Sequence, residues 1–187
     1  KDTSRGLGDV YKRQLNRTTK GHIIDLPGTY SLNASSMDES VVIELLLNKN
    51  SKDFPDVCVV VTDVENLKRN LLLFTQVKDL GLPTVLVINM ADQMKRKGIS
   101  IDIPFLEKAF DTKIALVSTR KNIGLEVLQN VILNYRQLST APTISLNSID
   151  KDYFQKLEKI FPNQSIYKLW LIITQDENYV NIYRKRV

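Results

Sequence analysis

The stretch Val85–Asp92, with the sequence VLVINMAD, decides the fold. It begins with an uninterrupted run of β-branched and aliphatic residues, which is typical of a strand in a mostly parallel sheet. Polar residues start directly where that strand should end. Ligands bind beyond the carboxyl ends of the strands in open α/β sheets, so the stretch predicts a strand followed by a ligand-binding rim.

The same pattern, a short apolar run that ends in a polar residue, recurs along the chain. We expect further strands at His22–Asp25, Val57–Thr62 and Ile114–Ser118, in addition to Val85–Asn89. Longer segments with helical spacing separate these runs. This alternation predicts an α/β fold with three layers, in which crossover helices cover a mostly parallel sheet.

The helices between the strands have recognisable starts and ends. Ser36–Glu39 has the S-x-x-E spacing of a capping box, and a helical stripe of apolar residues follows it. Another helix should start behind Asp63 and end at Gly81. Shorter helices are expected near Asp102–Phe110 and over Gly124–Leu138.

The two ends of the chain differ from its middle. Residues 1–14 show neither helical nor strand periodicity and resemble the translated adapter sequence found at the ends of metagenomic reading frames, so we interpret them as a non-native scar. Residues 15–138 should form the α/β domain and residues 139–149 a linker rich in Ser, Thr and Pro. Residues 150–187 predict two amphipathic helices that begin a second, helical domain and are cut short.

Composition excludes several classes of protein. The net charge of +5 is scattered, and no helix carries a basic stripe with aromatic residues, which argues against a nucleic-acid partner. The apolar runs are far shorter than the roughly 20 residues of a membrane-spanning helix. The single cysteine, Cys58, lies in an apolar run and is interpreted as a small buried residue. The single histidine, His22, has no second ligand at metal-binding spacing.

The first candidate motif is Asp25-Leu26-Pro27-Gly28, a D-x-x-G directly behind an expected strand. A carboxylate at a strand end can hold the water shell of Mg²⁺. A glycine three residues later lets a backbone N–H approach a terminal phosphate, because no Cβ stands in the way. If the motif stood alone, a simple turn after a strand would be the better explanation.

The second motif is Asn89-Met90-Ala91-Asp92, an N-x-x-D behind the next strand but one. A carboxylate in the Asp92 position can accept parallel hydrogen bonds from the N1–H and N2–H groups of guanine, which adenine does not offer. The Asn89 side chain would brace the base and a neighbouring loop. A site with such paired groups discriminates strongly, because the wrong base leaves its polar groups without partners.

The third motif is Ser118-Thr119-Arg120-Lys121, at the end of the last expected strand. The Ser118 hydroxyl could orient the Asp92 carboxylate, and the backbone N–H of Thr119 or Arg120 could donate to guanine O6. An exposed polar loop with a basic pair is the alternative. All of the motifs follow strands, in order and with helix-length crossovers between them, which makes coincidence a minor explanation.

The chain resembles the cytoplasmic G domain of ferrous iron transport protein B. The resemblance rests on GHIIDLPGTYSL (residues 21–32) with SMDE (residues 36–39), on DVENLKRNL (residues 63–71), on Asn89–Asp92 with Met where most G proteins have Lys, and on Ser118–Lys121. It extends from about Gly21 to Leu138. It implies a sheet of the P-loop GTPase type, and residues 150–187 look like the beginning of the family's helical domain.

The resemblance also implies GTP or GDP and Mg²⁺ as ligands, with Asp25 reaching the metal through water. The remaining nucleotide-binding positions it implies are Leu26, Pro27, Gly28, Asn89, Met90, Ala91, Asp92, Ser118, Thr119 and Arg120. The parent protein would lie at the cytoplasmic face of a bacterial inner membrane. There it would couple GTP binding to Fe²⁺ passage through a separate membrane domain, and it could form oligomers.

The sequence departs from the family pattern in one large respect. No G-x-x-x-x-G-K followed by Ser or Thr occurs in it, so we expect the phosphate loop and first switch to be missing and the sheet to be incomplete on its N-terminal side. Thr29 follows Gly28, with no glutamine to orient an attacking water, which implies slow hydrolysis even in the parent. This chain alone should be inactive.

Two other functions stay open. A soluble GTPase that associates with the ribosome or another RNA would share the fold, but it should carry a basic appendage where this chain has apolar helices. A truncated product that binds no nucleotide is the second alternative, because the phosphate loop is missing.

Overall fold

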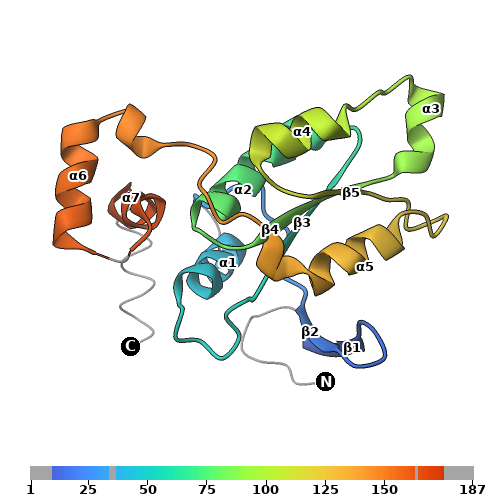
Figure 1. The fold of residues 1–187 in the computed structure, drawn as a ribbon, viewed down its shortest axis with the longest axis horizontal. Helices are drawn as coiled ribbons and strands as arrows, with labels where there is room; N and C mark the ends of the chain where they lie inside the picture. Colours follow the sequence, from blue (N-terminus) through green and yellow to red (C-terminus); the bar gives the residue numbers. More distant parts are fainter. Residues whose placement is uncertain (1–9, 34–36, 163, 175–187) are drawn as a thin grey trace. The chain divides into compact units, whose positions relative to one another are not determined.

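The computed structural model describes residues 10–33, 37–162 and 164–174 (Figure 1). The chain forms two compact units. The sheet unit comprises residues 55–145, and the hairpin-helix unit comprises residues 1–54 together with 146–187. Each unit is described by itself.

The sheet unit is built on three parallel strands, β3 (Cys58–Asp63), β4 (Thr84–Asn89) and β5 (Ile114–Leu116), in the order β3-β4-β5. The central strand β4 is buried from Thr84 to Ile88, as its continuous aliphatic run requires. The predicted strands of this unit are thus present. The last one is shorter than expected, because Ser118 forms an antiparallel bridge with Ile123 instead.

Helices cover both faces of this sheet (Figure 1). The helical elements of the unit are α2 (Leu67–Asp79), a short 3₁₀ turn η1 (Ala91–Gln93), α3 (Met94–Lys97), α4 (Ile103–Phe110), α5 (Leu125–Leu133) and η2 (Tyr135–Gln137). On one face the rings of Phe74 and Phe110 join α2 to α4, with centroids 5.5 Å apart and edge to face. On the other, Leu125 and Leu128 of α5 pack on a cluster around Val87.

A buried lysine at the end of α2, here called the Lys78 clamp, holds the segment that leaves the unit. Lys78 is 1% exposed, and its Nζ donates to the carbonyl oxygens of Asp111 (3.1 Å) and Ser139 (3.0 Å). Burial lowers the pKa of Lys78. The neighbouring Asp79 carboxylate accepts a hydrogen bond from the backbone N–H of Thr143. The beginning of the predicted linker is therefore tied to α2.

Strand β3 is an edge of this sheet within the described part of the chain. Its side chains alternate, so Val60 and Thr62 are buried while Val59 is 39% and Val61 is 61% exposed. Apolar side chains on an edge strand favour pairing with another chain.

We expect the chain to be marginally stable and to self-associate through this edge. Val61→Lys should reduce concentration-dependent association in light scattering, because a charge on an edge strand opposes further pairing. Val127→Lys on α5, where Val127 is 55% exposed, is the matched control and should change little. A monomeric chain with a cooperative melt well above about 45 °C would contradict this expectation.

The hairpin-helix unit begins with strands β1 (Val10–Gln14) and β2 (Lys20–Ile24), which pair antiparallel with Lys12 opposite His22. The strand predicted at His22–Asp25 is present, but its partner is β1 and not a parallel strand. Residues 10–14, which we interpreted as part of a non-native scar without strand periodicity, form β1. Their side chains are mostly exposed and show no apolar alternation, so the backbone ladder and a turn around Asn16 hold them.

Helices α1 (Met37–Leu47), α6 (Lys151–Ile160) and α7 (Ile166–Thr174), with a short turn η3 (Leu146–Ser148), complete this unit. The two helices expected after the linker are thus present. Phe154 packs edge to face on Trp170, and Lys168 Nζ donates to the Leu47 carbonyl at 3.1 Å. Ser36 of the predicted capping box lies outside the described residues. Among the described residues, no helix has both the length and the apolar character that crossing a membrane requires.

Candidate functional site

The loops that follow β4 and β5 are joined through Asn89, the last residue of β4. Its Oδ1 accepts a hydrogen bond from the Thr119 backbone N–H at 3.2 Å, and its Nδ2 lies 3.3 Å from Thr119 Oγ1. The same Oδ1 accepts from the Met90 N–H at 2.8 Å. Asn89 therefore braces the loop after β5, as the N-x-x-D pattern predicts.

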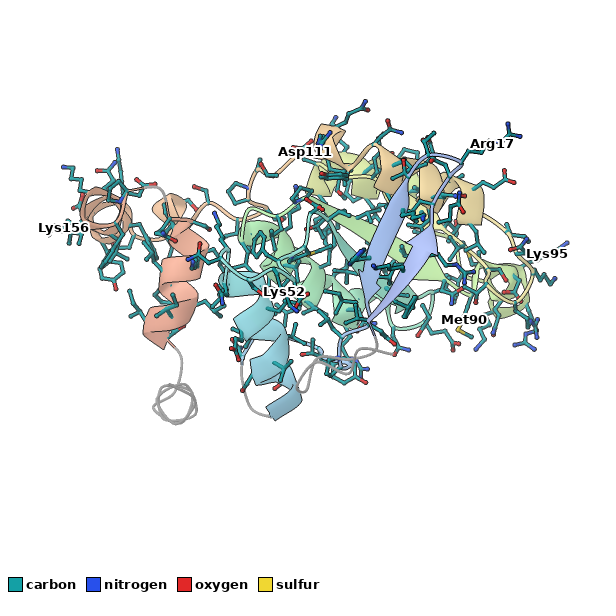
Figure 2. The ribbon with its side chains drawn as sticks, turned by 90° about the horizontal axis from the view of Figure 1, so that it is seen from below. Arg17, Lys52, Met90, Lys95, Asp111 and Lys156 are labelled. Atoms are coloured by element: carbon teal, nitrogen blue, oxygen red, sulfur yellow. The ribbon has the colours of Figure 1, made fainter. Side chains whose placement is uncertain are left out.

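The backbone after Asn89 turns sharply. Met90 adopts a left-handed conformation with φ 65°, which is uncommon for a residue with a side chain. The next N–H, of Ala91, donates to the Val117 carbonyl at 3.0 Å. Figure 2 shows Met90 and Lys95 at the same end of the sheet unit, away from Asp111. The turn brings the short helix η1 and its Asp92 alongside the end of β5.

The Asp92 carboxylate is held on both oxygens. Ser118 Oγ donates to Oδ1 at 2.6 Å, and Arg120 Nη2 donates to Oδ2 at 2.8 Å. Ser118 is fully buried, while the Asp92 side chain is 4% and the Arg120 side chain 77% exposed. The sequence pointed to the Ser118 contact. It gave no reason to expect the Arg120 side chain here.

The hydrogen bond from the Ser118 hydroxyl, and next the hydrogen bond and positive charge of Arg120, lower the pKa of Asp92. A carboxyl group whose pKa is lower in the folded than in the unfolded state stabilises the fold fully at pH values above its unfolded pKa, about 3.9. That contribution disappears as the pH falls through the folded pKa. Asp92 is therefore a charged acceptor at neutral pH.

The loop after Ser118 depends on Gly124, which sequence inspection did not single out. Gly124 has φ 75°, and a Cβ there would lie 2.3 Å from the Leu116 carbonyl oxygen and 3.2 Å from Val117 Cα. Both are backbone atoms of β5 and its extension. The close approach allows Ser118 and Ile123 to exchange N–H···O hydrogen bonds of 3.0 Å in both directions.

We expect Gly124→Ala to cost about 3 kcal/mol of unfolding free energy, because its Cβ would collide with backbone that cannot move aside. Gly98→Ala is the matched control. Gly98 has φ 64° but no atom within 4 Å of a Cβ, so only the left-handed conformation opposes the change, at about 1 kcal/mol. Urea unfolding measures both. Equal losses would show that the close contact at Gly124 has no energetic weight.

The D-x-x-G motif belongs to the hairpin-helix unit, directly behind β2. Asp25 and Gly28 are exposed, and Leu26 and Pro27 are half-buried. Thr29 Oγ1 donates to the Ser31 carbonyl at 2.8 Å. Gly28 does not have a positive φ, and no described atom lies within 4 Å of a Cβ placed there. Local structure therefore gives no reason for glycine at this position.

Other polar residues that end strands have structural roles. Asp63, at the end of β3, accepts hydrogen bonds from the N–H groups of Glu65 (2.8 Å) and Asn66 (2.9 Å) before α2, and the Asn66 side chain lowers its pKa most. Thr62 Oγ1 accepts from Asn70 Nδ2 at 2.8 Å.

Cys58 is the first residue of β3. Burial raises the pKa of its thiol to about 12, so the thiol is unreactive at neutral pH.

No group of three or more His, Cys, Asp or Glu side chains within residues 10–33, 37–162 and 164–174 is placed to hold a metal ion. A metal that one carboxylate holds through water does not need such a group. The exposed Asp25 is compatible with that arrangement.

Comparisons with known proteins identify the family. The family described as ferrous iron transport protein B matches residues 9–132, a range that includes β1. The Fe(2+) transporter FeoB of Campylobacter jejuni is 37% identical over 111 residues, which is 59% of this chain and 18% of that protein. The chain thus spans about a fifth of the length of such relatives.

Solved structures show the same resemblance. The FeoB G-domain from Methanococcus jannaschii is 31% identical with a TM-score of 0.62, covering 72% of this chain and 79% of that one. The cytosolic domain of the T. maritima FeoB iron transporter in a GDP form is 25% identical with a TM-score of 0.78, covering 94% and 69%. The fold is therefore that of P-loop GTPase G domains, and the chain belongs to the ferrous iron transport protein B family.

Proposed function

We propose that this chain carries the base-recognising half of a guanine-nucleotide site, in a protein that couples GTP binding to Fe²⁺ transport. The main evidence is the position of the Asp92 carboxylate. The Ser118 hydroxyl holds it at 2.6 Å, and Asn89 braces the loop that carries Ser118. Positioned acceptors of this kind discriminate between bases because they are fixed before the ligand arrives.

Guanine would present N1–H and N2–H to the Asp92 carboxylate. Its O6 needs a donor on the opposite loop, and the Thr119 N–H already donates to Asn89 Oδ1. The backbone N–H of Arg120 is therefore the better candidate for O6. Met90 and Ala91 would contribute the turn that places Asp92.

For the phosphates, the sequence pattern points to the D-x-x-G motif. The exposed Asp25 carboxylate suits the water shell of Mg²⁺. Gly28 is glycine without a local structural need, which supports close approach of a phosphate to its backbone. Leu26 and Pro27 would shape the turn between them. Mg²⁺, when bound, would neutralise phosphate charge.

Hydrolysis by the parent should be slow. Thr29 stands where a water-orienting glutamine would be needed, and its hydroxyl is already engaged with the Ser31 carbonyl. The proposed role is thus regulatory. The parent would lie on the cytoplasmic face of a bacterial inner membrane, with a membrane domain as its partner.

The alternatives differ in observable ways. A ribosome- or RNA-associated GTPase receives no support, because the family match is to an iron transport protein. Base recognition by the Asp92 loop is tested by competition between nucleotides. We expect this chain, with its native upstream segment, to bind GDP at least a hundredfold more tightly than ADP in calorimetry, since adenine lacks both donors. Equal affinities would refute the proposal.

A further inference from the structure

We propose that Arg120 is a displaceable gate over the Asp92 carboxylate, which a guanine base must move aside in order to bind. The inference rests on the proposed function, because it concerns the same site. It gives the Arg120 side chain a role of its own, separate from that of its backbone N–H.

The Arg120 side chain covers the Asp92 carboxylate and is itself largely exposed to solvent. The Asp92 side chain is only 4% exposed, whereas the Arg120 guanidinium that donates to its Oδ2 at 2.8 Å is on a side chain 77% exposed. The other oxygen, Oδ1, already accepts from the buried Ser118 hydroxyl. A base that must reach the carboxylate with two parallel N–H groups needs this cover removed.

Of the described groups around the carboxylate, Arg120 is the one free to move. Ser118 Oγ also accepts from the Lys121 N–H at 3.3 Å, and its backbone pairs with Ile123. Among the described residues, the Arg120 side chain makes only its hydrogen bond to Asp92. The loop can therefore keep its shape, through Thr119 and Asn89, while the guanidinium swings out.

Moving the Arg120 side chain away from Asp92 should cost little free energy. An ion pair with one exposed partner contributes little and is screened by salt. Its removal should therefore tighten guanine-nucleotide binding by about two- to fivefold at low salt, and by less at high salt. A residue that merely maintained the loop would give the opposite sign, because its loss would weaken binding.

The test uses this chain with its native upstream segment and GDP as the probe, in calorimetry at low and high salt. Arg120→Ala is compared with Lys121→Ala, which removes the same charge from the neighbouring position. The comparison cancels the long-range attraction that either cation exerts on the anionic phosphates. We expect Arg120→Ala to bind GDP two- to fivefold more tightly than Lys121→Ala does.

A second pair of variants isolates the contact with Asp92. In an Asp92→Asn background, probed with xanthosine diphosphate, Arg120→Ala and Lys121→Ala should bind equally, because the charged partner of Arg120 is gone. Arg120→Ala should also raise the pKa of Asp92, followed by NMR of its carboxyl carbon. That readout needs no nucleotide.

The outcomes separate the two proposals. If the unsubstituted protein prefers GDP but Arg120→Ala binds it no better than Lys121→Ala, the gate is refuted and the nucleotide site stands. If the unsubstituted protein shows no preference for GDP over xanthosine diphosphate, the nucleotide site itself is refuted and the gate with it.

Discussion

Asp92→Asn should exchange the base preference of the site, with GTP bound about a hundredfold more weakly and xanthosine triphosphate correspondingly more tightly. Asparagine keeps the shape of the side chain and can still accept from the Ser118 hydroxyl, which lies 2.6 Å from Oδ1. What changes is the second atom, which becomes an amide donor. Xanthine offers an acceptor where guanine offers N2–H, so the new donor has a partner.

The measurement is competition calorimetry on this chain with its native upstream segment. The ratio of the two affinities should shift by about ten-thousandfold, because both terms move. Glu65→Gln is a suitable control, since it removes the same charge from the end of the sheet unit, where Glu65 pairs with Lys97 of α3 and not with a side chain of the N-x-x-D loop. Unchanged GTP affinity in Asp92→Asn would show that Asp92 does not read the base.

The features of the fold that could be predicted are those with a strong local signal. The apolar run before Asn89 indicated a buried strand, and β4 is that strand. The sequence also placed Ser118 beside Asp92, because the carboxyl ends of neighbouring parallel strands meet at one rim. The order of the motifs along the chain therefore predicts which of their side chains lie close together.

The hairpin β1–β2 could not be predicted in the same way. Its outer strand, Val10–Gln14, is almost wholly exposed, so it shows no apolar alternation. Backbone hydrogen bonds and the turn at Asn16 hold it, and neither leaves a strong mark on composition. Exposed ribbons of this kind are visible only once both partners are placed.

Several contacts within the sheet unit could likewise not be predicted from the sequence. The Lys78 clamp joins residues 61 positions apart in the case of Ser139, and an isolated lysine in a helix usually signals a solvated face. Arg120 was expected only to supply a backbone N–H. A KNIG turn with Gly at its end could have drawn attention to Gly124, whose φ of 75° admits few other residues.

The largest expected effect on nucleotide affinity comes from the contacts to the phosphates. The sequence contains no G-x-x-x-x-G-K followed by Ser or Thr. Such a loop supplies several backbone N–H donors and a lysine to the phosphates, and each charge-assisted bond contributes about 1.5 to 3 kcal/mol. Three missing bonds correspond to about 5 to 9 kcal/mol, enough to turn micromolar binding into millimolar or weaker.

The most direct measurement is therefore calorimetry with a non-hydrolysable GTP analogue and Mg²⁺, on this chain alone and on the chain with its native upstream segment. Asn89, Asp92 and Ser118 can hold a base weakly, so we predict no measurable binding by the first and micromolar binding by the second, with slow hydrolysis when GTP replaces the analogue. Low-micromolar binding by this chain alone would mean that other residues hold the phosphates. This chain would then be more than a base-recognising half that lacks a phosphate loop.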